Sequence, residues 1–116
     1  MSVDTTRARR AERRAGGCCL PRRIARSDRE RARDVSDAAR ALADPIRVEI
    51  LDLLREAGGE VCQCELQPLF GISQPTLSHH LKKLVEAGLL SVERRGKWAW
   101  YSMPDDSLEV LTSWLS

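Results

Sequence analysis

The stretch from Ser73 to Gly88 most constrains the fold of this chain, because it predicts one helix with both ends marked. Ser73 can accept a hydrogen bond from a free N–H of the first turn, and Pro75 has no N–H to lose there. Gly88 can adopt the left-handed conformation that ends a helix. The apolar residues recur at the helical period and so form one stripe that faces a core. They are Leu77, Leu81, Leu84, Val85 and Ala87.

The opposite face of this helix is polar and carries Thr76, His79, Lys82 and Lys83. Ahead of it, residues 61–70 predict a short helix, and Gly71-Ile72 forms a tight link. A short helix, a glycine-containing turn and a polar-faced second helix form a helix-turn-helix. We therefore interpret residues 73–88 as a DNA-recognition helix, although an amphipathic helix taken alone is more often an ordinary surface helix.

Two helices precede this motif. Residues 27–43 have a thin, alanine-rich apolar stripe that suits close packing against another helix, such as one across a dimer. Asp44-Pro45 then caps and begins a helix that ends at Gly58-Gly59. This second helix is the most apolar of the chain, and we expect it at the centre of the core.

A hairpin and a last helix follow the recognition helix. Residues 89–93 and 98–103 predict strands, and Arg94-Arg95-Gly96-Lys97 links them as a tip with three cations. Residues 104–107 open a last helix whose leucines and Trp114 would expose a large apolar patch in a monomer. The fold class is thus mainly α with a β-hairpin wing, a winged helix-turn-helix, and residues 27–116 form a dimerising DNA-binding domain.

Charge is distributed unevenly along the chain. The net charge is only +2, but residues 1–26 hold eight arginines against Asp4 and Glu12. These residues lack hydrophobic periodicity, so we expect a mobile basic N-terminal arm that carries Cys18-Cys19. Residues 1–14 are either a solvated tail or a contact to DNA phosphate. The remaining residues are net acidic, so DNA binding must rest on local basic patches.

No apolar run approaches the ~20 residues that span a bilayer, so we expect a cytoplasmic protein with no membrane partner. Thiols are reduced in that compartment. The cysteines form two close pairs, Cys18-Cys19 and Cys62-Gln63-Cys64, whose polar neighbours argue against four merely buried side chains. In an ideal helix Cys62 and Cys64 diverge by ~200°. Both can bind one ion only if Cys62 lies in or before the irregular first turn.

The chain resembles the ArsR/SmtB family of bacterial metalloregulators over residues 27–115. The motifs that carry the resemblance are Ala41-Leu42-Ala43-Asp44-Pro45-Ile46-Arg47, Ser73-Gln74-Pro75-Thr76-Leu77-Ser78-His79-His80-Leu81-Lys82, Glu86-Ala87-Gly88-Leu89-Leu90, and Arg94-Arg95-Gly96-Lys97-Trp98 with Tyr101. The family consists of homodimeric winged-helix repressors that leave operator DNA when a metal ion or metalloid binds.

The resemblance also implies a ligand. Val61-Cys62-Gln63-Cys64-Glu65-Leu66 is similar to the cysteine motif of members that sense arsenite, antimonite, cadmium or lead. The Cys18-Cys19 context is similar to actinobacterial arsenic sensors. Gln67 stands where some arsenic sensors have a third cysteine, so the arm must supply at least one ligand. Residues 104–116 contain no histidine, which departs from members that sense zinc or nickel there.

Thiolates select soft ions. Three of the four sulfurs, Cys18, Cys19, Cys62 and Cys64, satisfy As(III) or Sb(III), whereas all four suit Cd(II) or Pb(II). A thiol redox-sensing repressor, in which an arm cysteine bridges to Cys62 or Cys64, is a further alternative. An enzyme with Cys62 as nucleophile would need a low-pKa thiol beside a base or a helix N-terminus, and also a substrate cleft. The chain has no Cys-X-X-Cys motif, no phosphate loop and no spare acid–base pair. We expect no enzyme and no organic cofactor.

The expected DNA contacts come from the recognition helix and the wing. Double-stranded operator DNA is the expected partner of a homodimer. Ser73 begins the contact surface. The side chains expected near base edges are Gln74, Thr76, Ser78 and His79, and those expected at phosphates are Lys82, Lys83, Arg94, Arg95 and Lys97.

Overall fold

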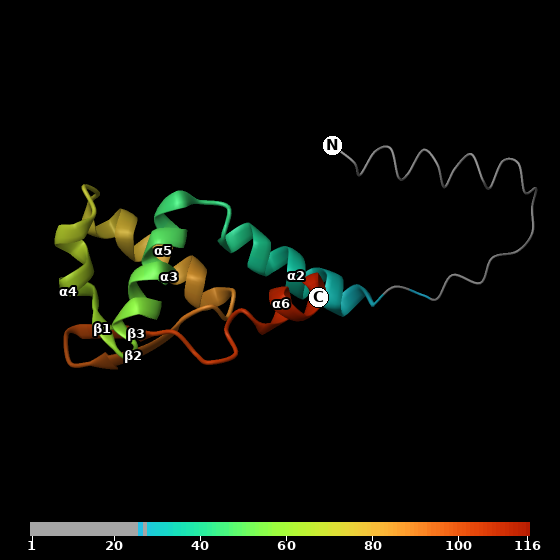
Figure 1. Ribbon diagram of the computed structural model, residues 1–116. Coiled ribbons are helices and arrows are strands. Elements are labelled where there is room, and N and C mark those ends of the chain that lie inside the picture. The colour runs from blue at the N-terminus through green and yellow to red at the C-terminus, as the bar shows by residue number, and fades with distance from the viewer. Residues whose placement is uncertain (1–25, 27) are drawn as a thin grey trace, which may run out of the picture.

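The computed structural model describes residue 26 and residues 28–116. Its elements follow in the order α2 (Arg29–Ala41), α3 (Pro45–Ala57), β1 (Val61–Cys62), α4 (Gln63–Leu66), the 3₁₀ turn η1 (Gln67–Leu69), α5 (Gln74–Glu86), β2 (Ser91–Arg95), β3 (Trp98–Ser102) and α6 (Glu109–Leu115) (Figure 1). The strands form one antiparallel sheet with β3 between β1 and β2. The architecture is the predicted winged helix-turn-helix.

The ends of α3 and α5 follow the local sequence signals. The Asp44 carboxylate accepts hydrogen bonds from the backbone N–H groups of Ile46 and Arg47 at 2.8 and 3.4 Å. Ser73 Oγ accepts from the backbone N–H of Thr76 at 3.3 Å. Gly88 after α5 has a φ of 77°, the left-handed conformation expected at that position. The capping predictions for both helices are confirmed.

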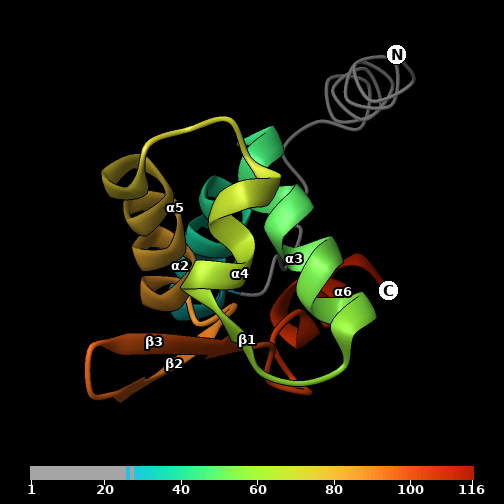
Figure 2. The same cartoon turned by 90° about the vertical axis from the view of Figure 1, so that its left-hand side faces the viewer.

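The core lies between α3, α5 and the sheet. The predicted apolar stripe of α5 is buried, and it packs with the central residues of α3. Figure 2 shows α3, α4 and α5 grouped above the sheet, with the β2–β3 hairpin extending to one side. The fully buried large side chains are Ile50, Leu54, Leu66, Leu77, Leu81, Leu84 and Leu89. Burial of this stripe fixes which face of α5 points outward.

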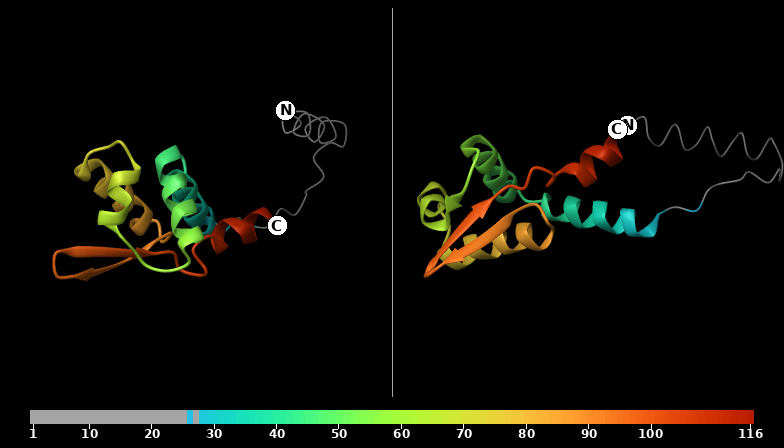
Figure 3. Two further views of the ribbon diagram at one scale, coloured as in Figure 1. Left: turned by 60° about the vertical axis from the view of Figure 1, so that its left-hand side comes forward. Right: turned by 90° about the horizontal axis from the view of Figure 1, so that it is seen from below.

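Helices α2 and α6 lie side by side at the end of the molecule away from the wing, as two views agree (Figures 1 and 3). Val35, Ala38 and Ala41 form the buried stripe of α2. On α6, Trp114 and Leu115 remain 54% and 74% exposed.

No helix within residues 28–116 combines the length and hydropathy of a membrane span.

Three local expectations differ from the structure. Residues 61 and 62 are a strand, not the start of a helix, because Val61 pairs with Tyr101 and Cys62 with Trp100. Arg94 and Arg95 belong to β2, so only Gly96 and Lys97 form the hairpin turn. The last helix begins at Glu109 because residues 105–108 form turns, and no side chain caps its start.

Candidate cysteine site and nucleic-acid interface

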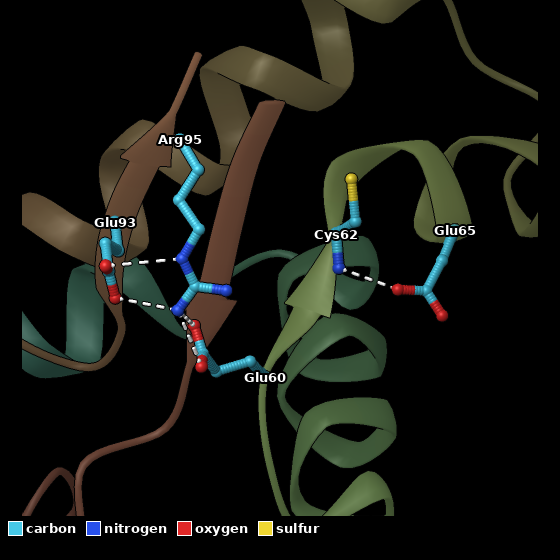
Figure 4. Close-up of polar contacts among 5 residues, drawn as sticks. All are labelled: Glu60, Cys62, Glu65, Glu93 and Arg95. Carbon is cyan, nitrogen blue, oxygen red and sulfur yellow. Dashed lines mark hydrogen bonds and ion pairs between the residues drawn. The ribbon is translucent and has the colours of Figure 1, made fainter. Parts of the chain in front are cut away.

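Cys62 is the N-cap of α4 and is almost completely buried. Its backbone is extended, and its Sγ accepts a hydrogen bond from the backbone N–H of Cys64 at 3.4 Å. In return, the Cys62 backbone N–H donates to Glu65 Oε1 at 2.9 Å, as Figure 4 shows. This reciprocal arrangement is a capping box that uses a sulfur in place of a hydroxyl. Cys62 therefore precedes the first helical turn, as binding of one ion by both cysteines requires.

The sulfur atoms of Cys62 and Cys64 lie 2.6 Å apart. Cys64 is exposed, and both thiols are free. The hydrogen bond to the Cys62 thiol raises the pKa of the Cys64 thiol, and local desolvation of the Cys64 sulfur adds to this. A soft ion that binds there as to a thiolate must displace the thiol proton. Two converging sulfurs provide two of the donors that such an ion needs.

A third donor does not come from the described residues. No group of three or more histidine, cysteine, aspartate or glutamate side chains within residues 28–116 is placed to hold a metal ion. The nearby Glu65 carboxylate is engaged with the Cys62 backbone. The predicted arm ligands, Cys18 and Cys19, lie outside the described residues. The described part of the site is therefore a two-sulfur half-site.

The polar face of α5 is exposed over Gln74, Thr76, His79, Lys82 and Lys83. Both lysines lie 3.9 Å from the carboxylate of Glu86. Such exposed pairs contribute little, so both cations remain available to a phosphate. The exposed Ser73, besides capping the helix, shares a 2.8 Å hydrogen bond with the hydroxyl of Thr76.

One predicted DNA-contact residue of α5, Ser78, departs from this exposed pattern. Ser78 is half-buried, and its Oγ accepts a hydrogen bond from Gln63 Nε2 at 2.7 Å. His80, which is not among the predicted DNA contacts, is buried beside the apolar stripe. Its Nδ1 has no hydrogen-bond partner among the described residues.

The wing places its three cations in different environments. Arg95 Nη2 donates to both carboxylate oxygens of Glu60 at 2.9 and 2.7 Å and to Glu93 at 3.0 Å (Figure 4). Its guanidinium also lies 5.4 Å from the centre of a Trp100 ring. These carboxylates raise the pKa of Arg95, and Arg95 lowers the pKa of Glu93. Arg95 is thus neutralised in part by two acids.

The other two wing cations are less constrained. Lys97 Nζ lies 5.1 Å from the centre of the Trp98 ring, and the residue is exposed. The side chain of Arg94, whose backbone pairs with Ala99 in the sheet, makes no hydrogen bond or ion pair with a residue of the described part of the chain. Both residues line a groove of about 910 Å³ that runs between the wing, α4 and α5 and also includes Cys64, Ser78 and Lys82. The cysteine site thus opens onto the same groove as predicted DNA-contact residues.

Sequence reasoning did not identify Gln63 or Glu60 as functional candidates. Gln63 lies between the cysteines, yet its partner Ser78 is 15 positions away. Glu60 precedes β1, and its partner Arg95 is 35 positions away. Their proximity to the cysteine motif was visible in the sequence, whereas their partners depend on the tertiary structure.

A short helix, a tight turn, a capped second helix with an exposed polar face, and a basic hairpin define a winged helix-turn-helix DNA-binding protein. Residues 44–92 match the family described as bacterial regulatory proteins of the ArsR family. The chain is 40% identical over 79 residues to an arsenical resistance operon repressor of Staphylococcus xylosus. The aligned residues cover 68% of this chain and 74% of that protein.

Two further comparisons agree. An arsenical resistance operon repressor of Bacillus subtilis is 39% identical over 74 residues, covering 64% of this chain and 70% of that protein. The solution structure of a homodimeric winged helix-turn-helix DNA-binding domain from Mycobacterium bovis has a TM-score of 0.61 and 29% identity, covering 80% of this chain and 86% of that chain. The chain belongs to the ArsR family of bacterial regulatory proteins. It is a DNA-binding transcriptional repressor and not an enzyme.

Proposed function

We propose that this repressor binds operator DNA as a homodimer and is released when trivalent arsenic or antimony binds its cysteine thiolates. The convergence of the Cys62 and Cys64 sulfurs at the start of α4, directly ahead of the recognition helix, carries the proposal. The relatives from Staphylococcus xylosus and Bacillus subtilis, which are arsenical resistance repressors, support it.

The chemistry of the donors fits a thiophilic ligand. Trivalent arsenic or antimony forms bonds to thiolate sulfur and takes three such donors. Cys62 and Cys64 supply two, and one of Cys18 or Cys19 supplies the third, because Gln67 stands where some of the arsenic sensors that the chain resembles have a third cysteine. Use of all four cysteines favours cadmium or lead, and oxidation of the same thiols makes a redox sensor. Both remain alternatives to be separated by experiment.

A dimer accounts for the exposed apolar end of the molecule. Trp114 and Leu115 on α6 lie beside α2, and a monomer would leave them in water. The homodimeric domain from Mycobacterium bovis has the same fold. We assign residues 27–116 to this dimerising DNA-binding domain and residues 1–26 to an arm that carries Cys18-Cys19. The dimer would present two α5 helices to successive major grooves, about 34–36 Å apart.

The exposed surface of α5 and the wing supports the assignment of DNA contacts. Ser73, Gln74, Thr76, Ser78 and His79 are assigned to the base-reading end of α5. Lys82, Lys83, Arg94, Arg95 and Lys97 are assigned to phosphates, where each contact adds to the salt dependence of binding.

Arg94→Ala is expected to flatten the dependence of log K on log salt by about one unit, because one phosphate contact is lost. Arg95→Ala should flatten it less, since Glu60 and Glu93 already balance much of the Arg95 charge. Operator affinity measured by fluorescence anisotropy across a salt series tests both. A larger slope change for Arg95→Ala than for Arg94→Ala would contradict this ranking of the two arginines.

Gln74→Ala should leave the salt dependence of binding unchanged. It should instead lose about 1–3 kcal/mol of selectivity at one base pair.

The inducer is tested by measuring operator release against arsenite, antimonite, cadmium, lead, zinc and peroxide.

Replacing Cys18 and Cys19 together with serine should abolish release by arsenite, because the described half-site then lacks its third sulfur. Each single serine variant should respond partially, since the other arm cysteine remains. Release of the double variant at the wild-type arsenite concentration would exclude the arm as a donor, and release by peroxide alone would favour the redox alternative.

A further inference from the structure

Gln63 lies between Cys62 and Cys64 and reaches the recognition helix directly. Its side-chain Nε2 donates to Ser78 Oγ at 2.7 Å, and both residues are half-buried. Within residues 28–116 this is the only side-chain hydrogen bond that joins α4 to α5. Figure 2 shows the two helices next to each other. The residue enclosed by the cysteines is thus bonded to a predicted DNA-contact residue.

The covalent geometry makes the position of Gln63 dependent on the two sulfurs. If one ion joins Cys62 Sγ and Cys64 Sγ, the ring that it closes contains the backbone N, Cα and C atoms of Gln63. Cys62 Sγ also accepts the N–H of Cys64, so a shift of that sulfur toward an ion changes its position relative to the Cys64 backbone. Adjustment of the two thiolates to an ion therefore changes the backbone torsions of Gln63 and moves its side chain.

We propose that Gln63 is the positioning residue that transmits ligand binding from the cysteines to the recognition helix. In the ligand-free protein its bond to Ser78 holds α5 in the orientation that binds DNA, and ligand binding at Cys62 and Cys64 breaks that bond. The inference rests on the proposed function, because it requires a ligand at these thiols. It adds the specific contact through which that ligand acts.

A second contact, between Glu60 ahead of the cysteines and Arg95 of the wing, is less suited to transmit ligand binding. Glu60 contacts Arg95 of the wing, but both side chains are nearly half exposed, with 43% and 46% of their surface open to solvent. Exposed ion pairs are screened by salt and contribute little energy. The Gln63–Ser78 bond joins neutral, half-buried groups, so its loss is not compensated fully by water. The Gln63–Ser78 link to the recognition helix is therefore better suited to transmit ligand binding than the Glu60–Arg95 link to the wing.

Gln63→Met tests the proposal because methionine keeps the side-chain length and removes the donor. The operator affinity of the ligand-free variant is expected to fall about 3- to 10-fold, the range for one neutral hydrogen bond. Its arsenite-loaded affinity should equal that of the wild type, so the ratio between the two forms falls by the same factor. Anisotropy titrations on a selected operator duplex, with and without saturating arsenite, give both values.

Gln67→Met is the matched control. Gln67 Nε2 also donates at 2.7 Å, but to the backbone oxygen of Ile72 and not to α5. This variant should lower operator affinity equally with and without arsenite and keep the wild-type ratio. Circular dichroism and thermal melting confirm that both variants are folded.

A double-mutant cycle with Ser78→Ala separates transmission from direct DNA contact. In the Ser78→Ala background, Gln63→Met should have no further effect on ligand-free affinity. Amide hydrogen exchange without DNA gives an independent readout: the first turns of α5 should exchange in ligand-free Gln63→Met as fast as in arsenite-loaded wild type.

The outcomes distinguish this inference from the proposed function. If wild type neither binds arsenite nor releases DNA, the proposed function fails. If wild type responds and Gln63→Met keeps the full wild-type ratio, the proposed function stands and the role of Gln63 is refuted. Higher ligand-free affinity in Gln63→Met would also refute it, because the bond would then restrain Ser78 from DNA.

Discussion

Cys62→Ser is expected to bind operator DNA normally and to require more than about 100-fold more arsenite for release. Loss of an outer-shell partner alone costs about 10–100-fold in metal affinity, and Cys62 is proposed as a direct donor. Serine keeps the structural role, because its hydroxyl is a preferred N-cap and can accept the Cys64 N–H as the thiol does. The fold and the ligand response are therefore separable at this position.

Cys64→Ser provides the matched comparison at the other sulfur. Cys64 is exposed and caps nothing, so serine there should leave the thermal midpoint nearly unchanged while causing a similar loss of response. Bound arsenic measured by equilibrium dialysis, together with operator release, checks both variants. If Cys62→Ser releases DNA at the wild-type arsenite concentration, Cys62 is not a donor and the two-sulfur half-site is wrong.

Leu81→Ala is expected to destabilise the domain by about 2–5 kcal/mol, through lost burial and the cavity left behind. Leu81 is 0% exposed and lies on the α5 stripe that fixes the outward face of the recognition helix. Because domains have only about 5–15 kcal/mol of stability, this variant should also bind operator less well at elevated temperature. Urea denaturation followed by circular dichroism at one fixed protein concentration measures the loss.

Lys82→Ala is the control for Leu81→Ala on the adjacent position. The Lys82 side chain is 73% exposed, and its contact with Glu86 is long at 3.9 Å, so its removal should change stability by less than about 0.5 kcal/mol. Its operator affinity should still fall at low salt if it contacts phosphate. A Leu81→Ala variant as stable as Lys82→Ala would show that this face of α5 is not buried.

The sequence by itself determined the frame of the protein. The ends of α3 and α5 were predicted because Asp44-Pro45, Gly58, Ser73 and Gly88 act on backbone groups only a few residues away. The apolar stripe of α5 also followed from local spacing, since its period matches the helix. These signals, with the motifs shared with the ArsR family, identified the winged helix-turn-helix and its recognition helix.

Only the tertiary structure decided how the cysteine segment is arranged. Residues 61 and 62 read as helix locally, but pairing of Cys62 with Trp100 in β3 holds them extended. That strand places Cys62 before the first turn of α4 and turns its sulfur toward Cys64. A strand this short has almost no local signal, because its backbone hydrogen bonds come from a distant part of the chain.

The same reason applies to the contacts that join the cysteines to the DNA-binding elements. Gln63 and Glu60 are ordinary polar residues in the sequence, and their partners Ser78 and Arg95 are remote from them along the chain. Which side chain they meet depends on the packing of α4 against α5 and on the register of the sheet. The sequence therefore predicted the two thiols as ligands and α5 as the recognition helix. Only the folded structure decided which side chains connect the cysteine segment to that helix.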